Sequence, residues 1–496
     1  MTAAAAKAAC EALSPGNRGM KPLIAMRAAL LDPALFGMVL DGDSWAAWRV
    51  LLIAICGEEL TTAERAIFES LTGREREPRE PVEEALIIKG RRCGGTRAAG
   101  ILAAYFGALC DHSSVLAPGE RATLPIMSAS IIQAGKAMQY IDGIFTHVPA
   151  LKALVIGQTV NSISLSNGVD IECAAASFRT IRGGTAVAII ADEVAFWRNE
   201  NTANPDTEIL NAARPMLATT AGPLIAITTP YSKRGEPWNI YKRDYGSTGD
   251  RLVLVAKASS RMLNPSLPQK VVDRAVERDP ASAAAKYGAE FRSDIEAFMS
   301  PEAVDAATFP DRLELPPERD VAYYAFVDAA GGSGGGDSMT MAIAHCEGDV
   351  TVLDCIREVK PPFSPDDTVK DFAATLARYG LREVTGDRWA TGFVAEAFEK
   401  CGVSYKTSER PKSDIYKELL PLLSSKRVEL LDLPRLRAQL VCLERRTARG
   451  GRDSIDHPQG AHDDIANSAA GALVIAAGIG RSSGFRLDIY MKAFGS

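Results

Sequence analysis

Two apolar runs in this sequence end in carboxylates whose positions suit catalysis. The run 186–191 is followed by Asp192 and Glu193, and the run 323–327 is followed by Asp328. Such runs are typical of buried strands in an α/β sheet, and ligands bind beyond the carboxyl ends of those strands. An Asp-Glu pair there suits nucleotide hydrolysis, in which one carboxylate holds Mg²⁺ and the other orients water. A strand-end Asp with further acids downstream suits a metal-dependent nuclease.

A glycine-rich loop, 89–96, lies between a predicted strand at 85–88 and a predicted helix at 97–102. In this context the backbone N–H groups of a loop and the helix N-terminus cradle phosphates. The match to the pattern GxxxxGK[ST] is imperfect, because Gly95 stands at the usual lysine position and Lys89 at the usual first glycine. An ordinary turn is the simpler interpretation of the loop alone, but the acidic strand end at 192–193 reverses that preference.

A third apolar run, 223–227, ends in Thr228 and Thr229, whose hydroxyls suit sensing of a γ-phosphate, and the segment 179–184 precedes the acidic strand. We therefore predict an ATP site in which Glu193 orients water, and in which Thr96 and Asp192 hold the metal. The predicted ATP-binding residues are Lys89, Gly90, Arg91, Arg92, Gly94, Gly95, Thr96, Asp192 and Thr228. If Lys89 is the phosphate-binding cation, we expect Gly95→Lys to be tolerated; an arginine of the loop is the alternative cation.

The C-terminal acids follow an order that suits a nuclease. Asp328 ends one strand, predicted strands follow at 338–344 and 349–354, Asp387 ends a further strand, and Asp463-Asp464 begins a predicted helix. Two Mg²⁺ or Mn²⁺ ions about 3.5–4 Å apart need three or four converging carboxylates. We predict Asp328, Asp387, Asp463 and Asp464 as catalytic metal ligands, without a choice between the last two. Asp337 and Asp354 are expected to serve turns, and His462 to support or cap the site.

Length and composition set bounds on the class of protein. A chain of 496 residues with 47% hydrophobic and 24% charged residues indicates a globular protein of two or three domains. No run reaches the roughly 18 apolar residues of a membrane span, and the N-terminus predicts no signal peptide. The 9 cysteines form no CxxC pair and are expected to be reduced. The net charge of −6 argues against a generic basic coat for nucleic acid, although arginine is locally dense at 91–97, 435–437 and 445–452.

The pattern along the chain predicts an α/β protein with two α/β domains. Residues 1–80 are predicted to be a helical segment of the first domain, which continues over 81–305 with alternating strands and helices. Prolines and mixed charge mark a linker at 306–319, and a second α/β domain is expected over 320–496.

The sequence resembles the large subunit of tailed-bacteriophage terminases over nearly its whole length. The matching segments are 89–96, 189–197, 228–230, 264–265, 289–292 and the set Asp328, Asp387 and 462–464. The resemblance implies an ASCE-type P-loop ATPase domain with a parallel sheet, followed by an RNase H-like nuclease domain. It also implies that Arg92 contacts phosphate and that Lys89 stands where some terminases carry their lysine.

In that family the function is ATP-driven translocation of viral double-stranded DNA into procapsids, with metal-dependent cleavage of concatemeric DNA. The resemblance implies ATP, Mg²⁺ or Mn²⁺ with two ions in the nuclease site, and double-stranded DNA, a small terminase subunit and a portal or procapsid as partners. It further implies that the chain forms a homo-oligomeric ring when docked, that it does not associate with a membrane, and that it works in the cytoplasm of the bacterial host. Two alternatives are an ATPase-deficient DNA-binding assembly protein and a repair helicase-nuclease, although no second motor domain is predicted after residue 260.

Overall fold

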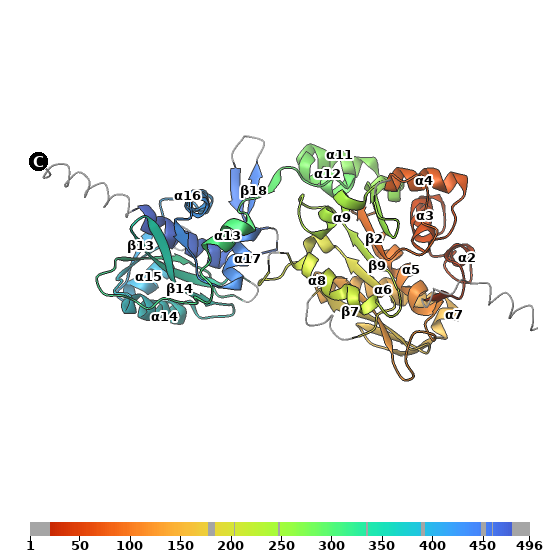
Figure 1. Ribbon diagram of the computed structural model, residues 1–496, viewed down its shortest axis with the longest axis horizontal. Coiled ribbons are helices and arrows are strands. Elements are labelled where there is room, and N and C mark those ends of the chain that lie inside the picture. The colour runs from red at the N-terminus through yellow and green to blue at the C-terminus, as the bar shows by residue number, and fades with distance from the viewer. Residues whose placement is uncertain are drawn as a thin grey trace, which may run out of the picture. The chain divides into compact units, whose positions relative to one another are not determined.

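A computed structural model describes residues 20–176, 184–202, 204–246, 249–333, 336–387, 392–447, 453–458 and 460–478 (Figure 1). The chain divides into two compact units, one of Met1–Arg198 with Asn204–Ser293 and one of Asn199–Ala203 with Asp294–Ser496. The division lies before the linker expected at 306–319, because Phe298, Met299 and Val304 pack in the core of the second unit. Among these described residues, no helix is both long and apolar enough to cross a membrane.

The first unit is built on an eight-stranded sheet of order β10-β2-β9-β8-β4-β7-β6-β5. Its strands are β2 (Glu84–Lys89), β4 (Ala122–Ser128), β5 (Val155–Gln158), β6 (Ser162–Leu165), β7 (Val169–Ala175), β8 (Ile189–Asp192), β9 (Leu224–Thr228) and β10 (Val253–Ala258). β10, β2, β9, β8, β4 and β7 are parallel, and β6 and β5 extend the sheet in antiparallel pairing. One strand, β9, therefore lies between the strand of the glycine loop and the acidic strand, as in ASCE-type sheets.

Helices cover both faces of this sheet because its strands are apolar on both faces. On β2, Ala85 and Ile87 belong to one core cluster, whereas Leu86 and Ile88 belong to another. The helices of this unit are α2 (Met26–Leu31), α3 (Ala46–Ile55), α4 (Thr62–Thr72), α5 (Gly95–Ala108), α6 (Ile131–His147), α7 (Pro149–Lys152), α8 (Pro205–Ala213), α9 (Glu236–Asp244), α10 (Ser260–Leu263), α11 (Gln269–Arg278) and α12 (Pro280–Gly288). Lys21–Pro22 (β1) pairs with Cys110–Asp111 (β3) in a separate two-stranded sheet.

The second unit contains a six-stranded sheet of order β16-β15-β12-β13-β14-β17. Its strands are β12 (Tyr323–Asp328), β13 (Met339–Glu347), β14 (Val350–Val359), β15 (Glu383–Gly386), β16 (Ser404–Thr407) and β17 (Val428–Glu429). β12, β13 and β14 form an antiparallel meander, and β15 pairs in parallel with the other side of β12. This is the strand order of an RNase H-like sheet, so the predicted fold class is confirmed for both units.

The helices of the second unit pack on this sheet and carry several of the acids. They are α13 (Pro301–Ala307), α14 (Pro365–Arg378), α15 (Phe393–Lys400), α16 (Lys412–Ser424), α17 (Pro434–Cys442) and a last helix over 464–478. A small sheet combines β11 (Ile295–Ala297), β18 (Glu444–Thr447) and β19 (Asp453–Asp456). Gly471 lets the last helix approach β12 closely, since a Cβ there would lie 2.3 Å from Cγ of Phe326.

The prediction that Asp354 serves a turn is wrong. Asp354 lies within β14, where its carboxylate contacts Nδ1 of His345 on the neighbouring strand at 2.8 Å. Burial alone would raise the carboxyl pKa of Asp354, and the His345 imidazole opposes that rise. In return, the hydrogen bond to Asp354 raises the pKa of His345 to about 9. The pair therefore joins two strands of the core.

Candidate nucleotide and metal sites

The glycine loop is held in shape by groups from outside it. The carbonyl oxygens of Arg91, Arg92 and Cys93 accept hydrogen bonds from Ser260 Oγ (2.6 Å), Asn264 Nδ2 (2.8 Å) and Trp48 Nε1 (2.6 Å). Gly90 is required where the loop meets Ser260, because a Cβ at residue 90 would lie 2.2 Å from Ser260 Oγ. Three consecutive carbonyls are thus engaged by neighbouring side chains.

The backbone N–H groups of the same loop are available for an anion. Within the described part of the chain, no oxygen accepts a hydrogen bond from the N–H of Arg92, Gly94 or Thr96. Gly94 is the N-cap of α5 with φ +86°, and Thr96 is the second residue of that helix. Donors at a helix N-terminus that lack partners form an anion site. The loop therefore fits a bound phosphate group.

Aromatic and basic side chains surround this loop. The ring of Trp45 lies against Gly94, where a Cβ would come within 2.5 Å of Cη2, and the guanidinium of Arg97 lies 5.0 Å from the Trp45 ring centroid. Arg97 is thus held by a cation–π contact, whereas Arg91 and Arg92 are exposed. Arg91 and Arg92 are therefore the loop guanidinium groups that are open to a ligand.

Lys89 and Glu193 form the central pair of this site. Lys89 is the last residue of β2, and its Nζ lies 2.8 Å from Oε1 of Glu193. Burial alone would lower the pKa of Lys89, but Glu193 raises it above its usual value. Burial alone would also raise the pKa of Glu193, and Lys89 lowers it below its usual value. Both groups are therefore charged at neutral pH, and the site contains an ammonium although residue 95 is glycine.

Lys89 occupies the space beside Gly95. A Cβ at residue 95 would lie 2.7 Å from Cε and 2.9 Å from Cδ of Lys89. The side chain of Lys89 is only 8% exposed and is held by Glu193, so it has little room to move away. A side chain at residue 95 would therefore have to displace Lys89, and whether Gly95→Lys is tolerated stays a prediction.

The remaining predicted ATP-site residues lie on adjacent strand ends. Asp192 ends β8, and burial, together with Glu193, raises its pKa to about 6. Thr228 ends β9, and its hydroxyl accepts the N–H of Ala195 at 3.1 Å, so it supports the turn after Glu193. Thr229 makes the closer contact, because its N–H and hydroxyl donate to Glu193 at 3.0 and 3.2 Å. Thr229 was therefore rightly considered with Thr228 in the sequence, although only Thr228 was included among the predicted ATP-binding residues. Most of the 179–184 segment, residues 179–183, lies outside the described residues.

In the second unit, strand register brings two predicted carboxylates together. Phe326 and Val327 of β12 pair with Thr385 and Gly386 of β15, so Asp328 and Asp387 follow at neighbouring strand ends. Burial, followed by the charges of Asp387 and Asp464, raises the pKa of Asp328 well above its usual value. Burial also raises the pKa of Asp387. These carboxylates carry negative charge that the chain itself does not fully offset, which is the chemistry of a cation site.

Asn467 on the last helix joins these carboxylates. Its Nδ2 donates to Oδ2 of Asp387 at 2.9 Å, and its amide also hydrogen-bonds to Asp328. The other amide atom, Oδ1, is buried and accepts no hydrogen bond from any described residue. A buried acceptor of this kind beside two carboxylates fits a site for a cation or its water. Asn467 was not predicted, although it lies one helical turn after Asp463.

Asp463 and Asp464 have different surroundings although they are adjacent in sequence. Lys412 Nζ lies 3.1 Å from Oδ2 of Asp463, and Tyr416 Oη donates to the same oxygen at 2.8 Å. Asp464 instead accepts the N–H of Ser338 at 2.8 Å. Burial, followed by the charge of Asp337, raises the pKa of Asp464 to about 6.

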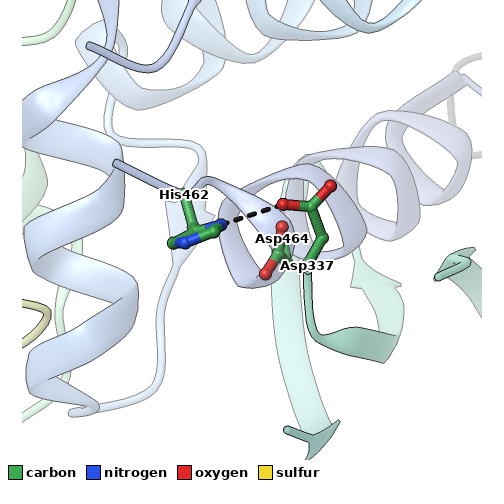
Figure 2. Close-up of side chains that lie close together, drawn as sticks. All are labelled: Asp337, His462 and Asp464. Carbon is green, nitrogen blue, oxygen red and sulfur yellow. Dashed lines mark hydrogen bonds and ion pairs between the residues drawn. The ribbon is translucent and has the colours of Figure 1, made fainter. Parts of the chain in front are cut away.

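Asp464 belongs to a group of three ligand-type side chains (Figure 2). One ligand atom each from Asp337, His462 and Asp464 lies within 4.8 Å of the others, and His462 Nδ1 is 2.9 Å from Oδ1 of Asp337. Asp337 was expected to serve a turn, but it lies with the predicted metal ligands and is part of the candidate site. A second such group combines Asp456, His457 and Asp463, of which only Asp463 was predicted.

The fold and the two sites define a chain that joins a P-loop unit to an RNase H-like unit with clustered carboxylates. No protein-family model matches it, and no curated protein does. Among solved structures, the HK97 bacteriophage large terminase matches at 16% identity over 79% of this chain and 91% of that chain, with a TM-score of 0.34. The large terminase of a thermophilic bacteriophage, solved in complex with ADP, matches at 12% identity over 79% and 93%, with a TM-score of 0.34.

The RNase H-like unit has matches of its own. The Mg²⁺-bound large terminase nuclease of thermophilic phage G20c matches at 18% identity over 36% of this chain and 96% of that chain, with a TM-score of 0.31. The ligands and activities in these names are those of the matched proteins, and the function of this chain has to follow from its own sites.

Proposed function

We propose that this chain is the large subunit of a viral terminase, an ATP-driven motor that moves double-stranded DNA into procapsids and cuts concatemeric DNA. One observation carries the proposal: a single chain joins a phosphate loop with a charged Lys89–Glu193 pair to an RNase H-like sheet in which Asp328 and Asp387 meet. A motor needs the first site, and cutting at the start and end of packaging needs the second. The charged Lys89 also argues against an ATPase-deficient assembly protein.

In the ATPase reaction, the loop N–H groups would donate to phosphate oxygens, and Lys89 would exchange its contact with Glu193 for one with a phosphate. Glu193 would then be free to orient the attacking water and accept its proton. Asp192 and Thr96 would hold Mg²⁺, which offsets the charge of the phosphates when bound. The exposed guanidinium groups of Arg91 and Arg92 would contact the same phosphates.

In the nuclease reaction, bound Mg²⁺ or Mn²⁺ ions supply an activated water and stabilise the leaving oxygen of a phosphodiester. Asp328, Asp387 and Asp464 would hold these ions, with Asp337 at the edge of the site. Asn467 would keep the first two carboxylates in place through its amide. Asp463 would support the site through Lys412 and Tyr416.

The proposal includes the partners and location of such a motor. We propose that the chain acts on viral double-stranded DNA together with a small terminase subunit and a portal or procapsid. It would form a homo-oligomeric ring when docked and would work in the cytoplasm of the bacterial host.

Two assays test the proposal. ATP turnover should rise when double-stranded DNA and procapsids are added, and Glu193→Gln should abolish turnover while ATP still binds. Plasmid cleavage should require Mg²⁺ or Mn²⁺ and should be lost in Asp328→Asn, which keeps its ATPase activity. An unwinding activity without packaging would favour a helicase-nuclease, and absent turnover in the unmodified protein would favour an assembly protein.

A further inference from the structure

A lysine side chain contacts one of the two groups of ligand-type side chains in the second unit. Lys412 Nζ lies 2.8 Å from Oδ1 of Asp456, and 3.2 and 3.1 Å from the two oxygens of Asp463. One ligand atom each from Asp456, His457 and Asp463 lies within 4.8 Å of the others. The ammonium therefore contacts two of the three side chains that could otherwise share a metal ion.

The chain fixes this lysine in place. Lys412 is the first residue of α16, where the helix dipole disfavours a positive charge. The start of that helix is bound to β19, because Ser413 Oγ donates to the carbonyl of Ile455 at 2.9 Å and accepts its N–H at 3.0 Å. Tyr416, one turn later, donates to Asp463 at 2.8 Å. Lys412 thus carries a positive charge at an unfavourable helix position, and the side chain of the next residue, Ser413, binds the strand that carries Asp456. This arrangement holds the ammonium beside its two carboxylates.

The neighbouring group lacks such a cation. No lysine or arginine in the described ranges forms an ion pair with Asp337 or Asp464. Oδ2 of Asp464 accepts the N–H of Ser338, whereas both oxygens of Asp463 contact Lys412. The two groups thus differ in a way that affects the binding of a divalent ion, because the group of Asp456, His457 and Asp463 already contacts a lysine.

We propose that Lys412 is a tethered cation that excludes a divalent ion from the Asp456, His457 and Asp463 group and so directs metal to the side of Asp464. Lys412 is then a positioning residue that acts through Asp463. The inference rests on the proposed nuclease function, because that function requires metal at Asp328, Asp387 and Asp464. It assigns Asp464 as the direct ligand of the adjacent pair and Asp463 as its support.

The test is the number of Mn²⁺ ions bound per chain, measured on the full-length protein by isothermal titration without nucleotide. Lys412→Met should bind one more ion than the unmodified protein, because removal of the ammonium leaves two carboxylates and an imidazole facing one another. Lys412→Arg should bind no extra ion, and Lys412→Met combined with His457→Ala should bind the extra ion at least tenfold more weakly. Lys417→Met is the matched control, since Lys417 lies on the same helix and pairs with the half-exposed Asp414.

If Lys412→Met is too unstable for the ion count, thermal unfolding with and without Mn²⁺ provides a second measurement. Its melting temperature should fall without metal and should rise with Mn²⁺ by several degrees more than that of the unmodified protein. An equal ion count and an equal rise with Mn²⁺ in Lys412→Met and the unmodified protein would overturn the inference. The nuclease proposal is tested separately by Asp328→Asn. It fails if this variant binds as many Mn²⁺ ions as the unmodified protein.

Discussion

The ion pair between Lys89 and Glu193 allows a quantitative test of the ATPase site without nucleotide. We consider Lys89→Met, Glu193→Gln and the double variant. Lys89→Met leaves the Glu193 carboxylate, among the described residues, with the two donors of Thr229, and Glu193→Gln leaves an ammonium whose side chain is 8% exposed. In each single variant one charge loses its partner in a poorly hydrated position.

The expected magnitude follows from burial. Removal of one partner of a fully buried pair costs about 3–5 kcal/mol in the free energy of unfolding. Glu193 is 28% exposed, so water reaches part of its carboxylate and the cost of Lys89→Met should be about 2–3 kcal/mol. The double variant removes both charges, and the coupling energy of the cycle should therefore be about 1.5–3 kcal/mol.

The assay is urea unfolding followed by tryptophan fluorescence, in a background of Trp389→Phe. The other four of the 5 tryptophans, at positions 45, 48, 197 and 238, lie in the first unit, so the signal then reports that unit. The exposed pair Lys257–Glu290 in the same unit provides the control cycle, with an expected coupling of about 0.2–1 kcal/mol. If the Lys89–Glu193 coupling energy is no larger than that of the control pair, the conclusion that Lys89 and Glu193 form a charged, poorly hydrated pair is wrong.

The same pair predicts a pH dependence of known sign. The pKa of Glu193 is lowered in the folded chain, so its contribution to stability is fully present above the unfolded value of about 4.3 and is lost as the pH falls through the lower, folded value. The difference in unfolding free energy between the unmodified protein and Glu193→Gln should therefore shrink only below about pH 4. A difference that shrinks above pH 5 would contradict the assignment.

Four further outcomes are expected. Gly95→Ala should push Lys89 from its place and reduce ATP turnover at least ~10-fold, whereas Gly143→Ala, where a Cβ meets nothing within 4 Å, should leave turnover unchanged. Asp328→Ala should reduce plasmid cleavage ~10²-fold or more and leave ATP turnover intact. Mn²⁺ affinity should fall as the pH is lowered through about 6, where Asp464 takes up a proton. The metal-free protein should gain stability as the pH falls from about 6 to about 4, the pKa of an unfolded Asp, and unfolding monitored by circular dichroism would report this gain. The pKa of His345 is raised to about 9, so the stability that it contributes should be present below about pH 6.5 and lost as the pH rises through 9, in contrast to His345→Gln.

The strand ends of the first unit could be predicted because each is a short apolar run with chemistry directly after it. The runs ending at Lys89, Asp192 and Thr228 correspond to β2, β8 and β9. The contact between Lys89 and Gly95 could not be predicted, since it depends on how a lysine at a strand end folds back over a helix N-terminus. The sequence lacks a lysine at residue 95, and the structure shows that the Lys89 side chain lies beside that residue.

The candidate metal site could be predicted only in part, for a related reason. Asp328 and Asp387 are strand-end acids, and the register of β12 with β15 makes them neighbours. Asn467 and Lys412 carry no comparable pattern, because an Asn inside a helix and a Lys at a helix start are common on exposed surfaces. The only local signal was the position of Lys412 at a helix N-terminus, where a positive charge is unfavourable unless something nearby binds it.

The adjacent pair Asp463-Asp464 illustrates why sequence alone could not assign the metal ligand. Successive residues at a helix start point about 100° apart, because the helix has 3.6 residues per turn, so the two carboxylates must face different neighbours. Which neighbours they face is decided by the strand and helix that pack there: the N–H of Ser338 donates to the Asp464 carboxylate, and Lys412 and Tyr416 contact the Asp463 carboxylate. Since a lysine contacts Asp463 whereas a backbone N–H contacts Asp464, the two acids should differ in their affinity for a cation. The asymmetry arises from residues far away in the sequence, and it is the basis for the proposal that Asp464 is the direct ligand.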